Sequence, residues 1–244
     1  MLKILRAHAS HGFEQGSFKI RRVRPGLIFG SKADPAFGPL AVLDHANLGV
    51  GTVVRMHEHK NDEILSYMWR GTMVHEDTAG HRIPISANKL MMMHAGESFW
   101  HEERTPDDPV EMLQIFVRPS EADLPALVDF YDRPDGAPRG RWGLVAGPEG
   151  GNAPLTVRNA VRVYDLHLHE GKEIEVPAIG GLSPWLYVMD GVIEVDVERL
   201  GKGDAVSDLD QPLPTVRAMT DATLVLFLVD RTAPASTAGT ISGR

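Results

Sequence analysis

The sequence predicts an all-β protein that contains two similar antiparallel barrels or sandwiches. Ten short runs rich in Val, Ile, Leu, Tyr and Thr recur along the chain, separated by Gly, Pro, Asn or Asp. The 24 Gly and 17 Pro among 244 residues favour frequent turns over long helices. Segments 67–72 and 187–192 share a strand–glycine turn–strand form, which predicts two hairpins. Because these segments lie 120 residues apart, they suggest two copies of one β-fold.

The predicted elements begin with short strands and include one helix. Residues 120–133 are the best helix candidate, because Leu124, Leu127, Val128 and Tyr131 recur at helical spacing. The predicted strands are 39–43, 51–56, 64–69, 72–75, 90–93, 110–117, 161–168, 184–189, 192–197 and 223–229.

Gly and Pro also divide the chain into domains. Residues 134–155 are dense in both and predict a linker. We therefore expect an N-terminal domain over 1–133 and a C-terminal domain over 156–232. Residues 233–244 are rich in Ala, Ser, Thr and Gly and are expected to form a flexible tail.

The composition excludes several kinds of chemistry. The chain has 11 His and no Cys, so a bound metal must be held by imidazole and carboxylate. The net charge of −8 argues against a nucleic-acid surface, which needs a basic patch. No run approaches the ~18 apolar residues of a membrane span, and the N-terminus lacks the apolar core of a signal peptide. These features predict a soluble, cytoplasmic protein with no nucleic-acid or membrane contact.

Two pairs of potential metal ligands occur at strand spacing. In a strand, residues i and i+2 point to one face, so His57 and His59 would share a face, as would His101 and Glu103. If the two strands are neighbours, three imidazoles and one carboxylate converge. Such a nitrogen and oxygen site suits iron, manganese, copper or nickel as well as zinc.

A lone His-x-His pair is a weak signal, because such histidines are usually exposed or part of the core. His167 and His169 have the same spacing but no supporting carboxylate or second pair, so we interpret them as structural or solvent-facing. His75 and His81 flank a predicted turn and are also expected to be exposed.

The first pair lies in a longer frame that resembles a known motif. Gly51, His57, His59, Glu63 and Gly71 form Gly-x5-His-x-His-x3-Glu-x7-Gly. This frame resembles the first motif of the cupin superfamily, although its last gap is one residue longer than usual.

A more specific resemblance is to the pirin family of bicupins. It rests on 57–67 (HEHKNDEILSY), 75–81 (HEDTAGH) and 93–103 (MHAGESFWHEE). It implies two jelly-roll-like cupin barrels, of which only the N-terminal one binds a metal. The chain departs from the family pattern at Glu58, which replaces Pro, and at Glu102, which replaces Ser.

Carried over by position, the family's ligands are His57, His59, His101 and Glu103, the same four that strand spacing selects. The resemblance implies one divalent metal per chain, with iron first and manganese, nickel, copper or zinc as alternatives.

The resemblance also implies a metal-dependent dioxygenase that cleaves a flavonol such as quercetin with O2 and releases carbon monoxide. Glu103 would be a ligand, or a general base that takes the proton of the substrate hydroxyl. One alternative is a non-catalytic, metal-binding regulatory protein that acts through protein partners. Another is a barrel that holds zinc only structurally.

Five residues are candidates for the surroundings of the metal. Glu63 would orient an imidazole or lie in a solvated loop. Phe99 would stack on an aromatic substrate or fill the barrel. Met91 and Met93 would line a pocket wall, although core packing is the favoured interpretation. His94 stands where the family has Thr or Ser and would affect access or pKa near the metal.

Overall fold

A computed structural model describes residues 1–30, 34–209 and 211–244. Most of the N-terminal half belongs to one large antiparallel sheet that curls on itself. In order across this sheet, its strands are β2 (His11–Gln15), β3 (Phe18–Val23), β4 (Leu40–Leu48), β11 (Val110–Val117), β6 (Glu63–Arg70), β9 (Lys89–His94), β8 (Arg82–Ser86), β7 (Thr72–Asp77), β10 (Phe99–Arg104) and β5 (Val53–His59), with β12 (Leu127–Asp132) beside β9.

The C-terminal half contributes two further sheets. The larger consists of β1 (Lys3–Leu5), β20 (Ala205–Ser207), β17 (Ser183–Asp190), β22 (Ala222–Val229), β15 (Val161–Leu168), β13 (Gly143–Pro148) and β14 (Leu155–Val157). The smaller consists of β16 (Glu173–Ile174), β21 (Val216–Ala218), β18 (Val192–Val195) and β19 (Glu198–Gly201). The helices in the described residues are two 3-10 turns, η1 (Ala7–Ala9) and η2 (Pro25–Phe29), and neither has the length or apolarity to cross a membrane.

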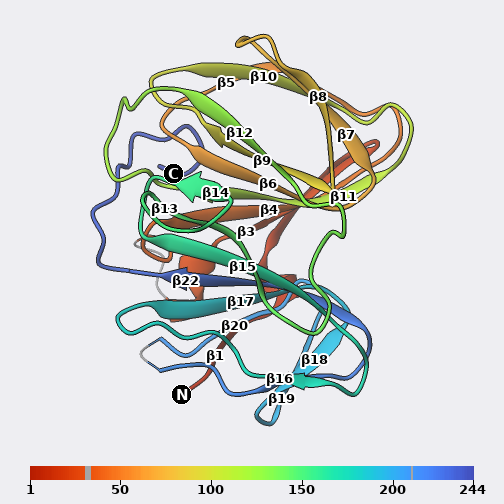
Figure 1. Cartoon of the computed structure of the whole chain (residues 1–244), viewed down its shortest axis with the longest axis vertical. Coiled ribbons are helices and arrows are strands. Elements are labelled where there is room, and N and C mark those ends of the chain that lie inside the picture. Colours follow the sequence, from red (N-terminus) through yellow and green to blue (C-terminus); the bar gives the residue numbers. More distant parts are fainter. Residues whose placement is uncertain (31–33, 210) are drawn as a thin grey trace.

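Figure 1 shows how the sheets are stacked along the long axis of the molecule. β5 and β10 lie at one end, β16 and β19 lie at the other, and β15, β22 and β17 lie between them. The fold is the predicted all-β bicupin fold, and each of the ten predicted runs overlaps a strand.

The middle sheet is buried on both faces. On β17, Trp185, Tyr187 and Met189 belong to the core shared with the N-terminal half, whereas Leu186 and Val188 belong to the core of the C-terminal barrel. β22 alternates between the two cores in the same way, and all of its residues are buried. This double burial explains the nearly continuous apolar run at 223–229.

The two predicted hairpins are wrong in their pairing, although the glycine turns are present. β6 is hydrogen-bonded to β9 and β11, while β7 is hydrogen-bonded to β8 and β10. β17 and β18 are likewise joined by a turn without bonding to each other. Gly71 and Gly191 have φ of 77° and 87°, and a Cβ at either would lie 2.2 Å from a backbone oxygen, of Pro109 and Asp221 respectively. At each glycine the chain therefore turns in close contact with a backbone segment that only glycine can approach. The strand that follows the turn then pairs with different neighbours.

The predicted helix over 120–133 is wrong, because its second half forms β12. Leu127 pairs with His94 and Asp132 with Lys89, so β12 extends the sheet beyond β9. Pro125 lacks an N–H and would interrupt a helix in this segment. The apolar spacing also fits alternation, as Val128 and Phe130 both pack against the core.

The segments predicted to be a linker and a tail contain a strand and packed contacts in the structure. Within 134–155, residues Gly143–Pro148 form β13, which pairs with β15 and β14. The tail packs against the N-terminal half, where Ser242 is fully buried and its carbonyl accepts a hydrogen bond from Arg118 Nε at 2.8 Å. The tail thus makes packed contacts in the structure, whereas the flexibility expected of 233–244 and the limits of the two domains stay predictions.

A buried ion pair joins the two halves. Asp165 on β15 is fully buried, and its Oδ2 accepts hydrogen bonds from Arg133 Nη1 and from Tyr67 Oη, the latter at 3.0 Å. Arg133 is itself almost fully buried. The carboxylate thus depends on a cation from the other half of the chain.

We expect Arg133→Met to lower the free energy of unfolding by about 3–5 kcal/mol, because it leaves a buried carboxylate without its cation. Arg82→Met is the matched control, since Arg82 is exposed and its contact with Glu76 is 3.7 Å long; we expect a change within about 0.5 kcal/mol. Urea unfolding of both variants checks this, and equal stabilities would contradict it.

Candidate metal centre

Three histidines meet between β5 and β10. His101 lies opposite His57 in the antiparallel register, and Phe99 lies opposite His59. The ring centroids are 4.4 Å apart for His57 and His101, 5.0 Å for His57 and His59, and 5.2 Å for His59 and His101. One nitrogen from each ring lies within 4.8 Å of the other two. The structure thus brings together the three histidines that the sequence selected.

Hydrogen bonds set which nitrogen His57 and His59 can offer. His57 Nδ1 lies 2.9 Å from the carbonyl oxygen of Arg55, which only accepts, so this nitrogen carries the proton and donates. His59 Nδ1 lies 3.0 Å from Oδ2 of the buried Asp62 and donates to that carboxylate. In both rings the lone pair is therefore on Nε2, the usual result of such partners at metal sites. Burial lowers the pKa of His57, which also favours the neutral, ligating ring.

His101 lacks any such partner. It is fully buried, and neither of its ring nitrogens has a hydrogen-bond partner among the described residues. Burial, together with the imidazoles of His57, His59 and His75, keeps the pKa of His101 well below its usual range. A neutral ring with two unpaired buried nitrogens is unfavourable in a protein interior, and a metal ion would satisfy one of them. The residues present therefore fit a divalent metal.

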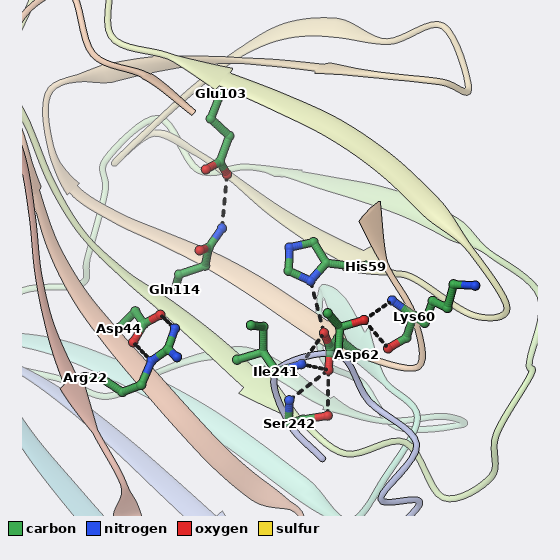
Figure 2. Close-up of polar contacts among 10 residues, drawn as sticks. Arg22, Asp44, His59, Lys60, Asp62, Glu103, Gln114, Ile241 and Ser242 are labelled. Atoms are coloured by element: carbon green, nitrogen blue, oxygen red, sulfur yellow. Dashed lines mark hydrogen bonds and ion pairs between the residues drawn. The ribbon is translucent and has the colours of Figure 1, made fainter. Parts of the chain in front are cut away.

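Glu103 lies beside the three rings rather than among them. Its Oε1 is 3.9 Å from His101 Nδ1 and accepts a hydrogen bond from Gln114 Nε2 at 3.1 Å (Figure 2). β10 and β5 change register between His101 and Glu103, so that Glu103 lies opposite Val54. Burial raises the pKa of the Glu103 carboxyl to about 7, an effect that the Gln114 hydrogen bond partly offsets. Its roles as a ligand and as a base stay predictions.

His75 is a neighbour of the site that sequence reasoning placed wrongly. It was expected to be exposed, but it is fully buried with its ring centroid 5.4 Å from that of His101. Its Nε2 lies 2.8 Å from Asp77 Oδ2, and β7 pairs with β10 so that His75 lies opposite Glu103. Met73, His75 and Asp77 are the buried residues of β7, so period-two alternation was the available signal. His81 is partly exposed and contacts Asp77 as well.

Glu63 orients an imidazole, but not one of the three. Its Oε2 is 2.5 Å from His94 Nδ1, and its Oε1 accepts a hydrogen bond from Arg158 Nε at 2.9 Å. Glu63 and His94 are both buried, and Arg158 comes from the C-terminal half. The ion pair between Glu63 and Arg158 therefore links the two halves of the chain.

The predicted apolar surroundings are buried, and one aromatic residue was missed. Phe99, Met91 and Met93 belong to the hydrophobic core, and core packing was the favoured prediction for the two methionines. The aromatic ring that contacts a site histidine is that of Phe116, whose centroid is 5.9 Å from that of His59. Phe116 is part of an apolar run on β11, so its sequence context showed only a core residue.

His167, His169 and Asp221 also place potential ligand atoms within 4.8 Å of one another. They lie on the C-terminal half, and His169 and Asp221 are exposed with side-chain exposures of 51% and 60%. Unlike the three buried rings, this group contains an ordinary solvent-facing ion pair of 3.4 Å between His169 and Asp221.

The fold and the site define a bicupin with a histidine-rich centre in its N-terminal barrel. Two family models match the chain: "Pirin" over residues 17–117 and "Quercetinase C-terminal cupin domain" over residues 144–229. The chain belongs to the pirin family.

Relatives agree with this assignment. The chain is 24% identical over 227 residues to quercetin 2,3-dioxygenase of Escherichia coli K12, covering 91% of this chain and 94% of that protein. It is 27% identical over 203 residues to a pirin-like protein of Caulobacter vibrioides, covering 81% and 88%.

Solved structures show the same fold. The bacterial pirin YhhW of Escherichia coli in complex with nickel(II) superposes with a TM-score of 0.80 at 21% identity, covering 94% of this chain and 99% of that one. A quercetin 2,3-dioxygenase of Acinetobacter baumannii superposes with a TM-score of 0.74 at 18% identity, covering 95% and 86%.

The raised pKa of Glu103 predicts a pH dependence of the stability of the metal-free protein. Between pH 4.5 and about 7 the folded chain holds a proton on Glu103 that the unfolded chain releases. Stability therefore falls as pH rises through this range, by up to about 1.4 kcal/mol per pH unit. The depressed pKa values of His57, His75 and His101 have the opposite sign, so the prediction concerns the difference between wild type and Glu103→Gln. Unfolding of both at pH 4.5 and 7.5 checks it, and parallel curves would contradict it.

Proposed function

We propose that this protein is a metal-dependent dioxygenase that cleaves a flavonol-type substrate with O2, and that iron is its metal. The observation that carries the proposal is the buried group of His57, His59 and His101, in which neither His101 nitrogen has a hydrogen-bond partner among the described residues. Relatives named quercetin 2,3-dioxygenase supply the reaction class and the aromatic substrate. The nickel(II) in the YhhW structure supports a divalent metal at this centre.

The chain's own residues have distinct tasks in this proposal. His57, His59 and His101 hold the metal through neutral imidazoles, with Nε2 as the donor of the first two. When bound, the metal supplies Lewis acidity that lowers the pKa of a coordinated hydroxyl. Glu103 accepts the proton of the substrate hydroxyl, for which a pKa of about 7 suits operation near neutral pH. Gln114 Nε2 holds the Glu103 carboxylate in place through its hydrogen bond.

Oxygen uptake by the metal-loaded protein tests this proposal. Protein is purified, analysed for its metals and reloaded separately with iron, manganese, nickel or copper. With quercetin we expect consumption of O2 and release of carbon monoxide in equal amounts. A protein that binds metal in every case but consumes no O2 with any flavonol would contradict the dioxygenase, and would favour a regulatory metal-binding protein.

A further inference from the structure

A buried carboxylate lies directly behind one of the proposed ligands. Asp62 is fully buried, and its Oδ2 accepts a hydrogen bond from His59 Nδ1 at 3.0 Å. A carboxylate in a protein interior needs several donors, because each oxygen can accept more than one hydrogen bond. The source of the remaining donors therefore decides how firmly His59 is held.

Those donors come from the far end of the chain. Asp62 Oδ1 accepts hydrogen bonds from the Ser242 backbone N–H at 2.9 Å and from Ser242 Oγ at 2.7 Å. Asp62 Oδ2 accepts one from the Ile241 N–H at 3.1 Å. Figure 2 shows the carboxylate of Asp62 between the His59 ring and this segment. His59 is thus connected through the Asp62 side chain to residues that lie 179 and 180 positions after Asp62.

The segment is also fastened on both sides of these donors. Thr240 is hydrogen-bonded to Lys60, the residue after His59: its N–H donates to the Lys60 carbonyl at 2.9 Å, and its Oγ1 accepts from the Lys60 N–H at 2.8 Å. The Ser242 carbonyl accepts from Arg118 Nε at 2.8 Å. The tail therefore follows the turn after β5 in a defined register.

Gly239 is a close-approach position in this segment. A Cβ there would lie 2.1 Å from Ser242 Oγ and 2.5 Å from Asp62 Oδ1. Both distances are far inside van der Waals contact, so even alanine would displace the hydroxyl or the carboxylate. The glycine thus permits the contact between tail and carboxylate.

We infer that residues 239–242, together with Asp62, are a positioning element of the metal centre. The tail donors orient the Asp62 carboxylate, and Asp62 holds the His59 proton on Nδ1, which leaves Nε2 for the metal. This inference rests on the proposed metal centre, in which His59 is a ligand. Without the tail donors Asp62 would be a buried carboxylate short of partners, free to turn away from His59.

Full-length variants test the positioning role. Ser242→Ala removes one donor, Gly239→Ala pushes the segment away, and Ser236→Ala is the matched control, because its hydroxyl contacts Ala238 in the same tail and not Asp62. Ni²⁺ affinity is measured by chelator competition, and 15N NMR of the His59 ring in the metal-free protein reports which nitrogen is protonated.

We expect Ser242→Ala and Gly239→Ala to weaken Ni²⁺ binding about 10-fold, at the lower end of the loss on removing an outer partner of a metal ligand. We also expect both variants to mix the two protonation forms of the His59 ring, and Ser236→Ala to behave as wild type. If Gly239→Ala does not fold, Ser242→Ala decides.

The outcomes separate the inference from the function on which it rests. Unchanged Ni²⁺ affinity and an unchanged His59 ring in Ser242→Ala would overturn the positioning role and leave the metal centre intact. A wild-type protein that binds no Ni²⁺, Fe²⁺ or Mn²⁺ would overturn the metal centre itself. In that event the His59 ring spectra would still show whether the tail fixes its protonated nitrogen.

Discussion

Replacing His101 by alanine is expected to abolish metal binding. In the part of the chain that the structure describes, the buried His101 ring has no hydrogen-bond partner, and one of its nitrogens lies within 4.8 Å of a nitrogen of both His57 and His59. Loss of an outer partner alone weakens metal affinity about 10- to 100-fold, so loss of a direct ligand should exceed about 100-fold. The change also removes a ring whose unpaired nitrogens are unfavourable when buried, so the metal-free variant should still fold.

Metal content and Ni²⁺ affinity measured on the same preparations check this prediction. His169→Ala is the control, because His169 has the same His-x-His spacing but is exposed on the C-terminal half. We expect the control to keep the full affinity. A His101→Ala protein that retains one metal per chain would rule His101 out as a ligand.

Replacing Glu103 by glutamine is expected to lower flavonol turnover by about 10²- to 10⁴-fold, the usual range for loss of a positioned acid or base. Glutamine keeps the size of the side chain but cannot take a proton. Because the three imidazoles remain, the variant should keep its metal. The loss should therefore fall on kcat rather than on metal content.

Glu102→Gln is the matched control for this experiment. Glu102 directly precedes Glu103 on β10 and pairs with the exposed Arg104 instead of facing the histidines. We expect it to retain wild-type turnover under the same metal loading. Full turnover by Glu103→Gln would contradict the role of Glu103 as the base.

The fold was predictable to the extent that it depends on alternation and turns. Runs of β-branched and aromatic residues marked the strands, and glycines marked the reversals at 71 and 191. Partner choice was not predictable, because the strands on either side of Gly71 bond to different neighbours. The segment at 127–132 was misjudged because Leu127, Val128 and Tyr131 fit a helix locally, whereas the free edge of β9 decides its structure.

The three histidines were predictable because strand spacing is a local property and the family resemblance selects the same residues. Their surroundings depend on contacts between distant parts of the chain. His75 is buried because β7 adjoins β10. Asp62 contacts His59 and accepts hydrogen bonds from residues of the C-terminal tail. The tail composition of Ala, Ser, Thr and Gly suggested mobility, because it carries few apolar side chains. In the structure the tail is instead held by backbone and hydroxyl hydrogen bonds, which composition does not reveal.

The most direct test of the metal centre is elemental analysis of freshly purified wild-type protein beside a His57→Ala/His59→Ala double variant. Both imidazoles lie on β5 and offer Nε2, so their joint loss leaves His101 without the partners needed to hold an ion. We predict one divalent metal per wild-type chain and none in the double variant. Full metal occupancy in the double variant would contradict the assignment of the centre.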